Sequence, residues 1–546
     1  MALLGADAAK DRLRAKGPIA RRSVFFPPAV VSVPAAIVAA ALLLPLIYLI
    51  LKTLGAGAET MELLVRISTL KILLRTCLLA LAVTGGSIAL AVPLAWLTVR
   101  TDLPLKGVLS VLTVLPLVIP SYVGGYVVVT ALGPRGMLQQ MLAGPFGIER
   151  LPEIYGFPGA FLTLTFLSYP YVLLSTRAAL WGLDPVLEDA SRSLGQGAWT
   201  TFRRVLFPQL RPAIAAGGLL VGLYTLSDFG AVSLLRFDTF TRVIYTQYQT
   251  SFDRTQAAAL SMVLVALALL ILSIEAVTRG SAKYYQSTSG SARPAIRVKL
   301  GAWRWPTLCC CGLLVLASVV MPLSVLGYWF VRGIAVGEPA RLVWGPMMNS
   351  LYVSGLAALV ATAAALPVVI LSVRYPGFLT GLLERISYLG FAVPGIVVAL
   401  ALVFFGANFA TPVYQSLVLL IFAYVLLFLP TALGVLRASL LQVSPGVEEV
   451  ARSLGQRPHQ VLATITLPLM RPGLLAGIAL VFLVTMKELP ATLILGPIGF
   501  KTLATSIWSA ADEAFFARAA APALLLILIT SIPAIFLTRR ERGLER

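Results

Sequence analysis

The chain has 546 residues, of which 58% are hydrophobic and only 12% are charged. Soluble proteins carry about twice that share of charged residues, so the composition excludes a soluble protein and indicates an integral membrane protein. The net charge of +20 would by itself suit a nucleic-acid-binding protein. The Lys and Arg residues, however, gather near the N-terminus, between the two halves and at the C-terminus. Because basic residues mark the cytoplasmic side of membrane proteins, we expect cytoplasmic termini and no nucleic-acid partner.

In chain order, residues 1–32 form a basic segment that we predict to be a cytoplasmic arm. The first repeat, residues 33–278, follows, and a Ser-, Gly- and Arg-rich segment, residues 279–306, is typical of a cytoplasmic linker. The second repeat covers residues 307–546. Together the repeats contain apolar stretches near the roughly 20 residues that a helix needs to cross a bilayer, namely Val33–Leu54, Ile72–Val99, Val108–Leu132, Gly159–Leu180, Pro212–Leu226, Ala257–Val277, Thr307–Val331, Ser350–Val373, Leu382–Phe405, Tyr414–Leu436, Pro472–Met486 and Ala514–Leu537.

These stretches predict an all-α polytopic membrane protein with about 12 transmembrane helices. Two of them, residues 212–226 and 472–486, are too short for a full span. We expect either that these helices begin earlier, near Val205 and Ile465, or that they stop inside the membrane.

One polar stretch occurs twice in this apolar chain. Polar loop 1, residues 184–208, and polar loop 2, residues 444–468, share a Pro near the start, a Gly and a closing Pro at one constant shift, since 455 − 195 and 468 − 208 both give 260. Asp184 or Ser444 can cap a helix that begins with Pro, and the acids that follow lie near its positive end. The Gly then permits the left-handed backbone that ends this helix.

The two loops resemble the Glu-Ala-Ala signature of ABC importer permeases, in which a Gly follows and a Leu-Pro-like end comes later. The residues that carry the resemblance are Glu188, Asp189, Ala190, Arg192, Gly195 and Pro208 in loop 1, and Glu448, Glu449, Arg452, Gly455 and Pro468 in loop 2. The match departs in detail, because Asp189 replaces Glu while Ser191 and Val450 replace Ala. The resemblance implies that each loop couples to an ATPase subunit.

The repeats also share upstream landmarks, with a different shift. Pro93, Arg100 and Pro120 pair with Pro367, Arg374 and Pro394, each 274 positions on (374 − 100). Because this shift exceeds the other by 14, the first repeat must carry a longer loop, most simply at residues 133–158 on the outer side. The halves share orientation, so they are parallel repeats. The resemblance implies two six-helix permease subunits of the type I ABC importer kind fused in one chain.

The partners follow from the same resemblance. A fused pair would bind two copies of an ABC ATPase and one periplasmic or lipid-anchored substrate-binding protein, in the inner membrane of a bacterium. The chain contains no Gly-x-x-x-x-Gly-Lys-Ser/Thr phosphate loop. We therefore expect that it is not an enzyme and binds no cofactor itself, and that ATP and Mg bind the ATPase subunits.

A pair of acids marks the candidate substrate path. Asp228 and Glu488 occupy the same place in the two repeats (488 − 228 is also 260), and a carboxylate at membrane depth is costly unless it lines water or meets a partner. The stretches around them resemble the ferric iron branch of these permeases. Fe(III) prefers carboxylate and phenolate oxygen, so the acids are candidates for transient metal contact, and the wider candidate path or gate adds Lys487, Tyr224, Tyr245 and Tyr248.

Other readings of the same residues stay open. The acids could instead cap broken helix ends or pair with Lys487 and Arg236. Importers of the same architecture carry thiamine, polyamine, phosphonate or sulfate. A secondary transporter also uses parallel repeats, but it has no reason for two matched cytoplasmic loops.

Overall fold

The computed structural model describes residues 29–55, 62, 64–183, 185–250, 255–278, 298–337, 343–391 and 393–543. Most of the predicted arm 1–32, the greater part of the linker 279–306 and Asp184 therefore lie outside the described residues. The described chain is helical, with a single isolated β-bridge and no longer strand within these ranges. It contains nine helices long and apolar enough to cross a membrane, or up to twelve if each of three bent pairs counts as one span.

The helices of the first repeat alternate long spans with short elements, and η marks short turns of 3-10 or π-helix. They are α2 Ala29–Leu54, α4 Ile67–Arg100, α5 Lys106–Leu112, η1 Leu115–Val118, α6 Ser121–Leu132, α7 Met137–Phe146, α8 Phe157–Trp181, α9 Pro185–Ser193, α10 Ala198–Thr201, η2 Phe202–Leu206, α11 Phe207–Ser227, α12 Gly230–Leu234, α13 Phe240–Thr250 and α14 Thr255–Thr278.

The second repeat follows the same plan. Its elements are η3 Gly301–Trp303, α15 Arg304–Val315, η4 Leu316–Val320, α16 Met321–Ala335, α17 Trp344–Arg374, α18 Phe378–Ser387, η6 Leu389–Phe391, α19 Gly395–Phe409, η7 Thr411–Val413, α20 Leu417–Gln442, α21 Pro445–Ser453, α22 Pro458–Val461, η8 Leu462–Thr466, α23 Leu467–Leu469, α24 Arg471–Met486, α25 Pro490–Leu495, α26 Leu503–Asp512 and α27 Phe516–Gly543.

Two of the apolar stretches that we expected to form single spans are broken. The chain bends by 97° between residues 106–118 and 121–146, and by 104° between residues 378–391 and 395–409. The residue before the second helix is Pro120 or Pro394, with an extended ψ of 150° or 147°. Proline lacks an N–H and its ring blocks continuation of the preceding helix, so an apolar run does not become one straight helix here.

The two short apolar stretches, residues 212–226 and 472–486, form their spans in different ways. In the first repeat the span begins earlier than residue 212, because a π turn at Phe202 leads directly into α11. In the second repeat, α24 starts at Arg471 and is bent by 71° from the segment 458–469. Each span therefore starts within or directly after its polar loop.

The first helix of each repeat packs on the other repeat. α2 contacts α17, α18 and α19, and its Ala35, Leu42 and Leu49 are buried in a core cluster made up mostly of residues of the second repeat. In return, Cys311 and Val315 of α15 are buried in the core of the first repeat. This exchange of first helices joins the repeats through buried apolar surface and close helix packing.

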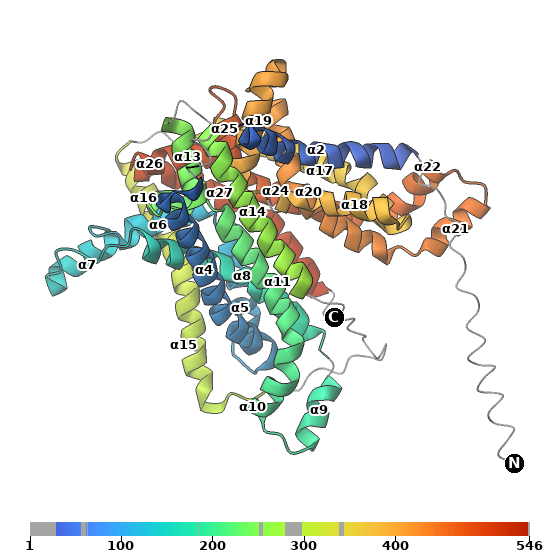
Figure 1. The fold of residues 1–546 in the computed structure, drawn as a ribbon. Coiled ribbons are helices and arrows are strands. Elements are labelled where there is room, and N and C mark those ends of the chain that lie inside the picture. Colours follow the sequence, from blue (N-terminus) through green and yellow to red (C-terminus); the bar gives the residue numbers. More distant parts are fainter. Residues whose placement is uncertain are drawn as a thin grey trace, which may run out of the picture.

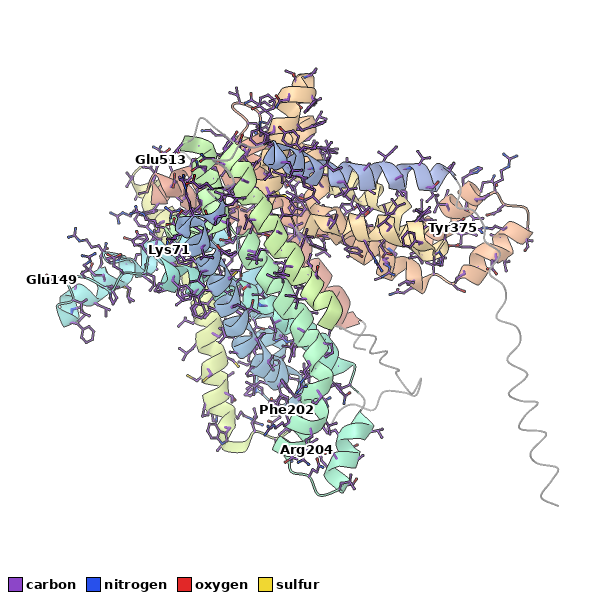
Figure 2. The ribbon with its side chains drawn as sticks, in the orientation of Figure 1. Lys71, Glu149, Phe202, Arg204, Tyr375 and Glu513 are labelled. Atoms are coloured by element: carbon purple, nitrogen blue, oxygen red, sulfur yellow. The ribbon has the colours of Figure 1, made fainter. Side chains whose placement is uncertain are left out.

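The repeats form two arms that diverge from a common region. Figure 1 shows α9 and α10 at the end of one arm and α21 and α22 at the end of the other, while α6, α16, α25, α26 and α27 gather where the arms meet. In Figure 2, Phe202 and Arg204 mark the first arm's tip, whereas Tyr375 lies along the second arm. The polar loops thus lie far from the junction that brings the repeats together.

Candidate functional site

The polar loops have the same local geometry. α9 starts with Pro185 and α21 with Pro445, as a first-turn proline favours. Two residues beyond the end of each helix stands a glycine with positive φ, +79° at Gly195 and +86° at Gly455. The next N–H, of Gln196 or Gln456, returns to a carbonyl five residues back at 3.2 Å, the hydrogen bond of a Schellman turn. Ser444 stands at the N-cap of α21, but its side chain makes no capping hydrogen bond.

One acid in each polar loop is buried and holds the loop against a membrane helix. Arg100, at the end of α4, donates from Nη1 to Glu188 Oε2 at 3.2 Å. Arg374, at the end of α17, donates to Glu448 Oε1 from Nη2 at 2.9 Å and from Nε at 3.2 Å. These arginines were noted in the sequence only as repeat landmarks. Their pairing with the loop acids was missed, although both kinds of residue recur once per repeat.

The neighbouring residues face outward. Asp189, Ala190 and Glu449 are exposed, whereas Glu188 and Glu448 are buried. Leu194 and Leu454, which share one repeat position, are 80% and 79% exposed. A large apolar side chain exposed at the same turn of both loops is a feature that the sequence reasoning did not single out.

Asp228 lies at the break between α11 and α12. Its Oδ2 accepts hydrogen bonds from the N–H groups of Ala231, at 3.1 Å, and Val232, at 3.2 Å. Ser121, the first residue of α6, lies beside the same carboxylate. The start of α6 packs on the start of α12 so closely that a Cβ on Gly230 would lie 2.6 Å from Tyr122 Cβ. The positive ends of two helices therefore surround this buried acid.

Glu488 occupies the matching break between α24 and α25. Its Oε1 accepts from the Ala491 N–H at 3.0 Å. A Cβ on Gly395, the first residue of α19, would lie 2.7 Å from the same oxygen. Within the described residues, the second oxygen of Glu488 accepts no hydrogen bond. The geometry matches the capping reading of the acids, and it leaves one oxygen of Glu488 without a protein donor.

The two basic residues considered as partners of the acids bind elsewhere. Lys487 donates from Nζ to the backbone oxygen of Leu117 at 2.8 Å, which joins the second repeat to η1 of the first. Arg236 lies over the Tyr155 ring, 5.3 Å from its centre. Neither cation forms an ion pair with Asp228 or Glu488 in the part of the chain that the structure describes.

The tyrosines fall into two groups. Tyr224 lies beside Asp228, and two tyrosines that the sequence reasoning missed, Tyr122 and Tyr424, lie near Glu488. Tyr424 hydrogen-bonds Thr492 Oγ1 at 2.6 Å, whereas the buried Tyr122 hydroxyl has no partner among the described residues. The sequence did offer one sign of Tyr122, because this residue lies two positions after Pro120, which recurs in the second repeat as Pro394.

Tyr245 belongs to a separate aromatic cluster. Its ring centre lies 4.7 Å from that of Phe229, which also packs on Trp508 of the second repeat at 4.9 Å. Tyr248 is on the same helix, α13, and packs against the core. Tyr245 thus contacts Phe229, the residue that follows Asp228. The cluster around Phe229 covers the junction of the two repeats with apolar rings.

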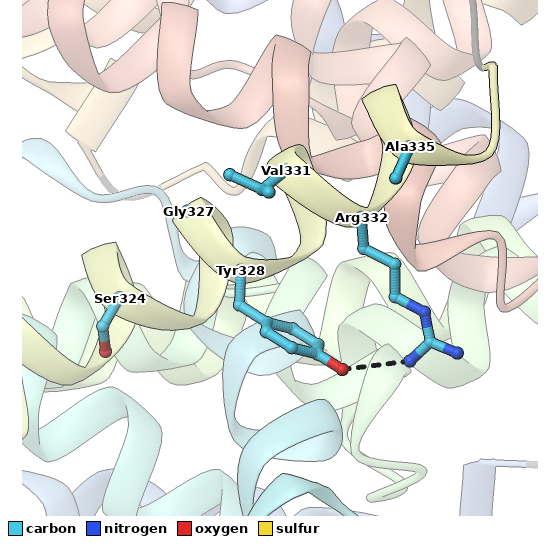
Figure 3. Close-up of a pocket in the computed structure, with 6 residues that line it drawn as sticks. All are labelled: Ser324, Gly327, Tyr328, Val331, Arg332 and Ala335. Atoms are coloured by element: carbon cyan, nitrogen blue, oxygen red, sulfur yellow. Dashed lines mark hydrogen bonds between the residues drawn. The ribbon is translucent and has the colours of Figure 1, made fainter.

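No group of three or more His, Cys, Asp or Glu side chains able to hold an ion occurs in the described part of the chain. An open groove of about 660 Å³ lies on one face of α16, where Arg332 donates to the Tyr328 hydroxyl at 3.1 Å (Figure 3). None of the predicted site residues lines this groove, so it is separate from the candidate path.

The family described as "Binding-protein-dependent transport system inner membrane component" matches residues 87–283 and 342–546, one match in each repeat. The chain belongs to this family. As a binding-protein-dependent permease it is a multi-pass inner-membrane component of an ABC importer rather than an enzyme. The two matches in one polypeptide identify a fused, two-repeat permease.

The relatives of this permease differ in length and name. An Fe(3+)-transport system permease protein of Haemophilus influenzae is 37% identical over 91% of this chain and 96% of that protein. A ferric transport system permease protein of Actinobacillus pleuropneumoniae is 25% identical over 77% of this chain and 64% of that protein. A molybdenum transport system permease protein of Escherichia coli is 35% identical over 36% of this chain and 89% of that protein.

Proposed function

We propose that this permease carries ferric iron. The observation that carries the proposal is the likeness to the Haemophilus influenzae Fe(3+) permease along almost the whole of both chains. The chemistry agrees, because Asp228 and Glu488 bring two carboxylates and the nearby phenols of Tyr224, Tyr122 and Tyr424 to one junction. Hard oxygen groups of this kind suit Fe(III).

The same proposal gives the acids two roles at once. One oxygen of each carboxylate stabilises the start of a short helix, and the carboxylate charge attracts a cation that enters the junction. Lys487, held on the Leu117 carbonyl, links the repeats across this point. We propose that this link belongs to the gate of the empty permease.

Polar loops 1 and 2 would each dock one copy of the ATPase, with loops and both chain termini on the cytoplasmic side. The support is their common form: a helix that begins with proline, a glycine turn, a buried acid that fixes the loop, and an exposed leucine at its tip. An exposed large apolar side chain at a loop tip suits a pocket on a partner. ATP and Mg would then bind those ATPase subunits.

The longer connection of the first repeat suits the external binding protein. It spans residues 133–156 and contains α7, whereas residues 410–416 join the matching helices of the second repeat. α7 extends away from the bundle (Figure 1). Such asymmetry would select one orientation of a single binding protein on a permease whose two halves are otherwise alike.

The test measures iron uptake into proteoliposomes that contain the permease–ATPase complex and receive the binding protein loaded with Fe(III). The double variant Asp228→Asn with Glu488→Gln keeps size and most hydrogen bonds but removes both charges. We expect uptake to fall on the order of tenfold or more while assembly is unchanged. Near-normal uptake by the assembled double variant would show that the acids act only as helix caps.

A second candidate substrate is an oxyanion. It is favoured by the likeness to a molybdenum permease over a third of the chain and by the cation Lys487 at the junction. The same proteoliposomes, given molybdate or sulfate with their binding protein, separate the two proposals. Uptake of an oxyanion with none of Fe(III) would replace the ferric proposal.

A further inference from the structure

The end of the linker is bonded to the end of α4. Val298 donates its N–H to the Arg100 carbonyl at 2.8 Å, and the Asp102 N–H returns to the Val298 carbonyl at 3.3 Å. The Asp102 side chain accepts from the Leu300 N–H at 2.9 Å and from Arg304 Nη2 at 2.6 Å. We call residues 298–304 the strap. It approaches the tip of the first arm, where α15 begins near α10 (Figure 1).

The strap meets the residue that holds polar loop 1. Arg100, whose carbonyl accepts from Val298, is the arginine that pairs with Glu188. A small cavity of about 30 Å³ is lined by Val298 together with Arg100, Glu188, Arg192 and Phe202. The strap therefore forms one wall of the space in which the loop acid and its arginine meet.

The two repeats hold their loops in different ways. In the second repeat, Glu448 accepts two hydrogen bonds from Arg374 and a third from the Thr466 hydroxyl at 3.0 Å. In the first repeat, Glu188 accepts one hydrogen bond from Arg100 and one from Arg192 of its own helix, at 2.7 Å. Leu206 stands at the position of Thr466 (466 − 206 is 260) and offers no hydroxyl. Arg100 Nε is buried with no partner among the described residues. Glu188 is thus joined to other elements by one hydrogen bond and Glu448 by three, so the anchor of loop 1 to its surroundings is the less complete of the two.

The second repeat also lacks the means to bind such a strap. Pro376 stands where Asp102 stands in the first repeat (376 − 102 is 274), so that position has neither a carboxylate nor an N–H. The Tyr375 N–H bonds within its own helix, to the Leu371 carbonyl at 3.0 Å. In the described ranges, no backbone pairing joins residues 374–376 to another segment.

We propose that the strap is a positioning element for polar loop 1, and that Asp102 is its key residue. The strap holds the Arg100 backbone from outside and so sets where Glu188, and with it the α9 helix, lies. The linker of the fused chain thereby replaces the hydroxyl that supports loop 2, and the two proposed ATPase-docking loops are not equivalent. The difference between the two docking loops rests on the docking function proposed above, whereas the positioning of loop 1 by the strap does not.

Hydrogen exchange of the full-length permease tests the positioning without any partner. Asp102→Ala removes both strap contacts of the side chain and should speed exchange of residues 185–196 on the order of tenfold, while residues 445–456 stay unchanged as the internal reference. Asp102→Glu, which keeps the carboxylate, should restore most of the protection. Equal change in both loops, or none in loop 1, would overturn the proposal.

The same variants then separate positioning from docking. With the ATPase present, Asp102→Ala should lower the fraction of permease that retains two ATPase copies, and Leu454→Asp in this background should remove the second copy. If Asp102→Ala loosens loop 1 but two copies stay bound, the positioning role stands and the docking function of loop 1 fails. If loop 1 does not loosen, the strap proposal fails whatever the ATPase does.

Discussion

Glu188 and Glu448 show what a single side chain does in this permease. Each is buried, pairs with an arginine from a membrane helix, and lies beside an acid that is exposed. Removing one partner from a buried ion pair leaves an uncompensated charge in a poorly solvated place, which is far more costly than losing an exposed charge. In each loop, the buried acid therefore fixes the loop to a membrane helix, while the exposed acid next to it remains free for a contact at the surface.

We expect Glu448→Ala to destabilise the junction of α21 and α17 by about 3–5 kcal/mol, because Arg374 loses its carboxylate. Thermal unfolding of the purified permease should start at a lower temperature, and ATPase should co-purify poorly. Glu449→Ala is the matched control, since that side chain is exposed. Equal shifts in the two variants would show that the buried pair has no special role.

Gly395 offers a way to move Glu488 without removing its charge. A methyl group there would lie 2.7 Å from Glu488 Oε1, the end of a flexible side chain, so the carboxylate must turn away while the backbone stays in place. We expect Gly395→Ala to fold and assemble but to lose most of its iron uptake. Gly434→Ala, where an added Cβ meets nothing within 4 Å, should transport normally. Normal uptake by Gly395→Ala would mean that the position of Glu488 is unimportant.

At the scale of elements, proline decides where apolar stretches break. Pro120 and Pro394 start α6 and α19 at sharp bends, and the starts of these helices meet the starts of α12 and α25. The breaks thus bring helix N-termini to Asp228 and Glu488, which helps a carboxylate remain charged within the protein. A straight span could not present an N-terminus at this depth.

The helix α7 permits a test of the outer face. Replacing residues 136–147 with a short Gly-Ser connection removes an element that the second repeat lacks. We expect the basal ATP hydrolysis of the complex to be unchanged and its stimulation by the binding protein to fall severalfold, because an oriented contact is lost.

Met141→Ser with Phe146→Ser is the milder companion variant, since both side chains are 72% exposed on α7. It should weaken stimulation in the same direction while the helix is kept. Full stimulation after complete removal of α7 would exclude this helix from the docking surface.

At the scale of the whole molecule, the repeats are held together by exchange of their first helices and by the aromatic junction. The Tyr126 hydroxyl donates to the Phe516 carbonyl at 2.8 Å, and the rings of these residues stack at 5.6 Å. Together with the cluster around Phe229, this joins the repeats at one end while the polar loops lie apart at the other. The contacts between the repeats thus lie away from the polar loops.

The strap adds a connection whose pH dependence is predictable. The Leu300 N–H and then Arg304 hold the pKa of Asp102 below its usual value of 3.8. A lowered pKa means that the stabilisation is fully present above the pKa of the unfolded chain, about 4, and is lost only as pH falls through the lower folded value. Arg304 is the charged group in contact with Asp102, with 2.6 Å between its Nη2 and Asp102 Oδ2.

We therefore expect the exchange protection of the Leu300 amide, corrected for intrinsic exchange, to be the same at about pH 8 and about pH 5. Asp102→Ala should lose protection at both values. A loss of protection in the unaltered permease between these values would show that the carboxylate titrates higher and that Arg304 does not hold it.

The sequence by itself determined the features that depend on local chemistry. Composition and apolar length gave a helical membrane protein, because a lipid environment demands internally bonded helices. The constant shifts revealed the two repeats and the longer connection near residues 133–158. Gly195 and Gly455 were predicted at left-handed turns because few other residues adopt them.

Only the tertiary structure decided which distant residues meet. The sequence could not show that Arg100 and Arg374 hold the loop acids or that Lys487 binds the Leu117 carbonyl rather than Glu488. Nor could it show that Tyr122 and Tyr424 lie near Glu488 while Tyr245 packs on Phe229. Nor could apolar length distinguish a straight span from one broken at Pro120. Such contacts depend on how whole helices pack, and packing is decided by surfaces that come from many parts of the chain.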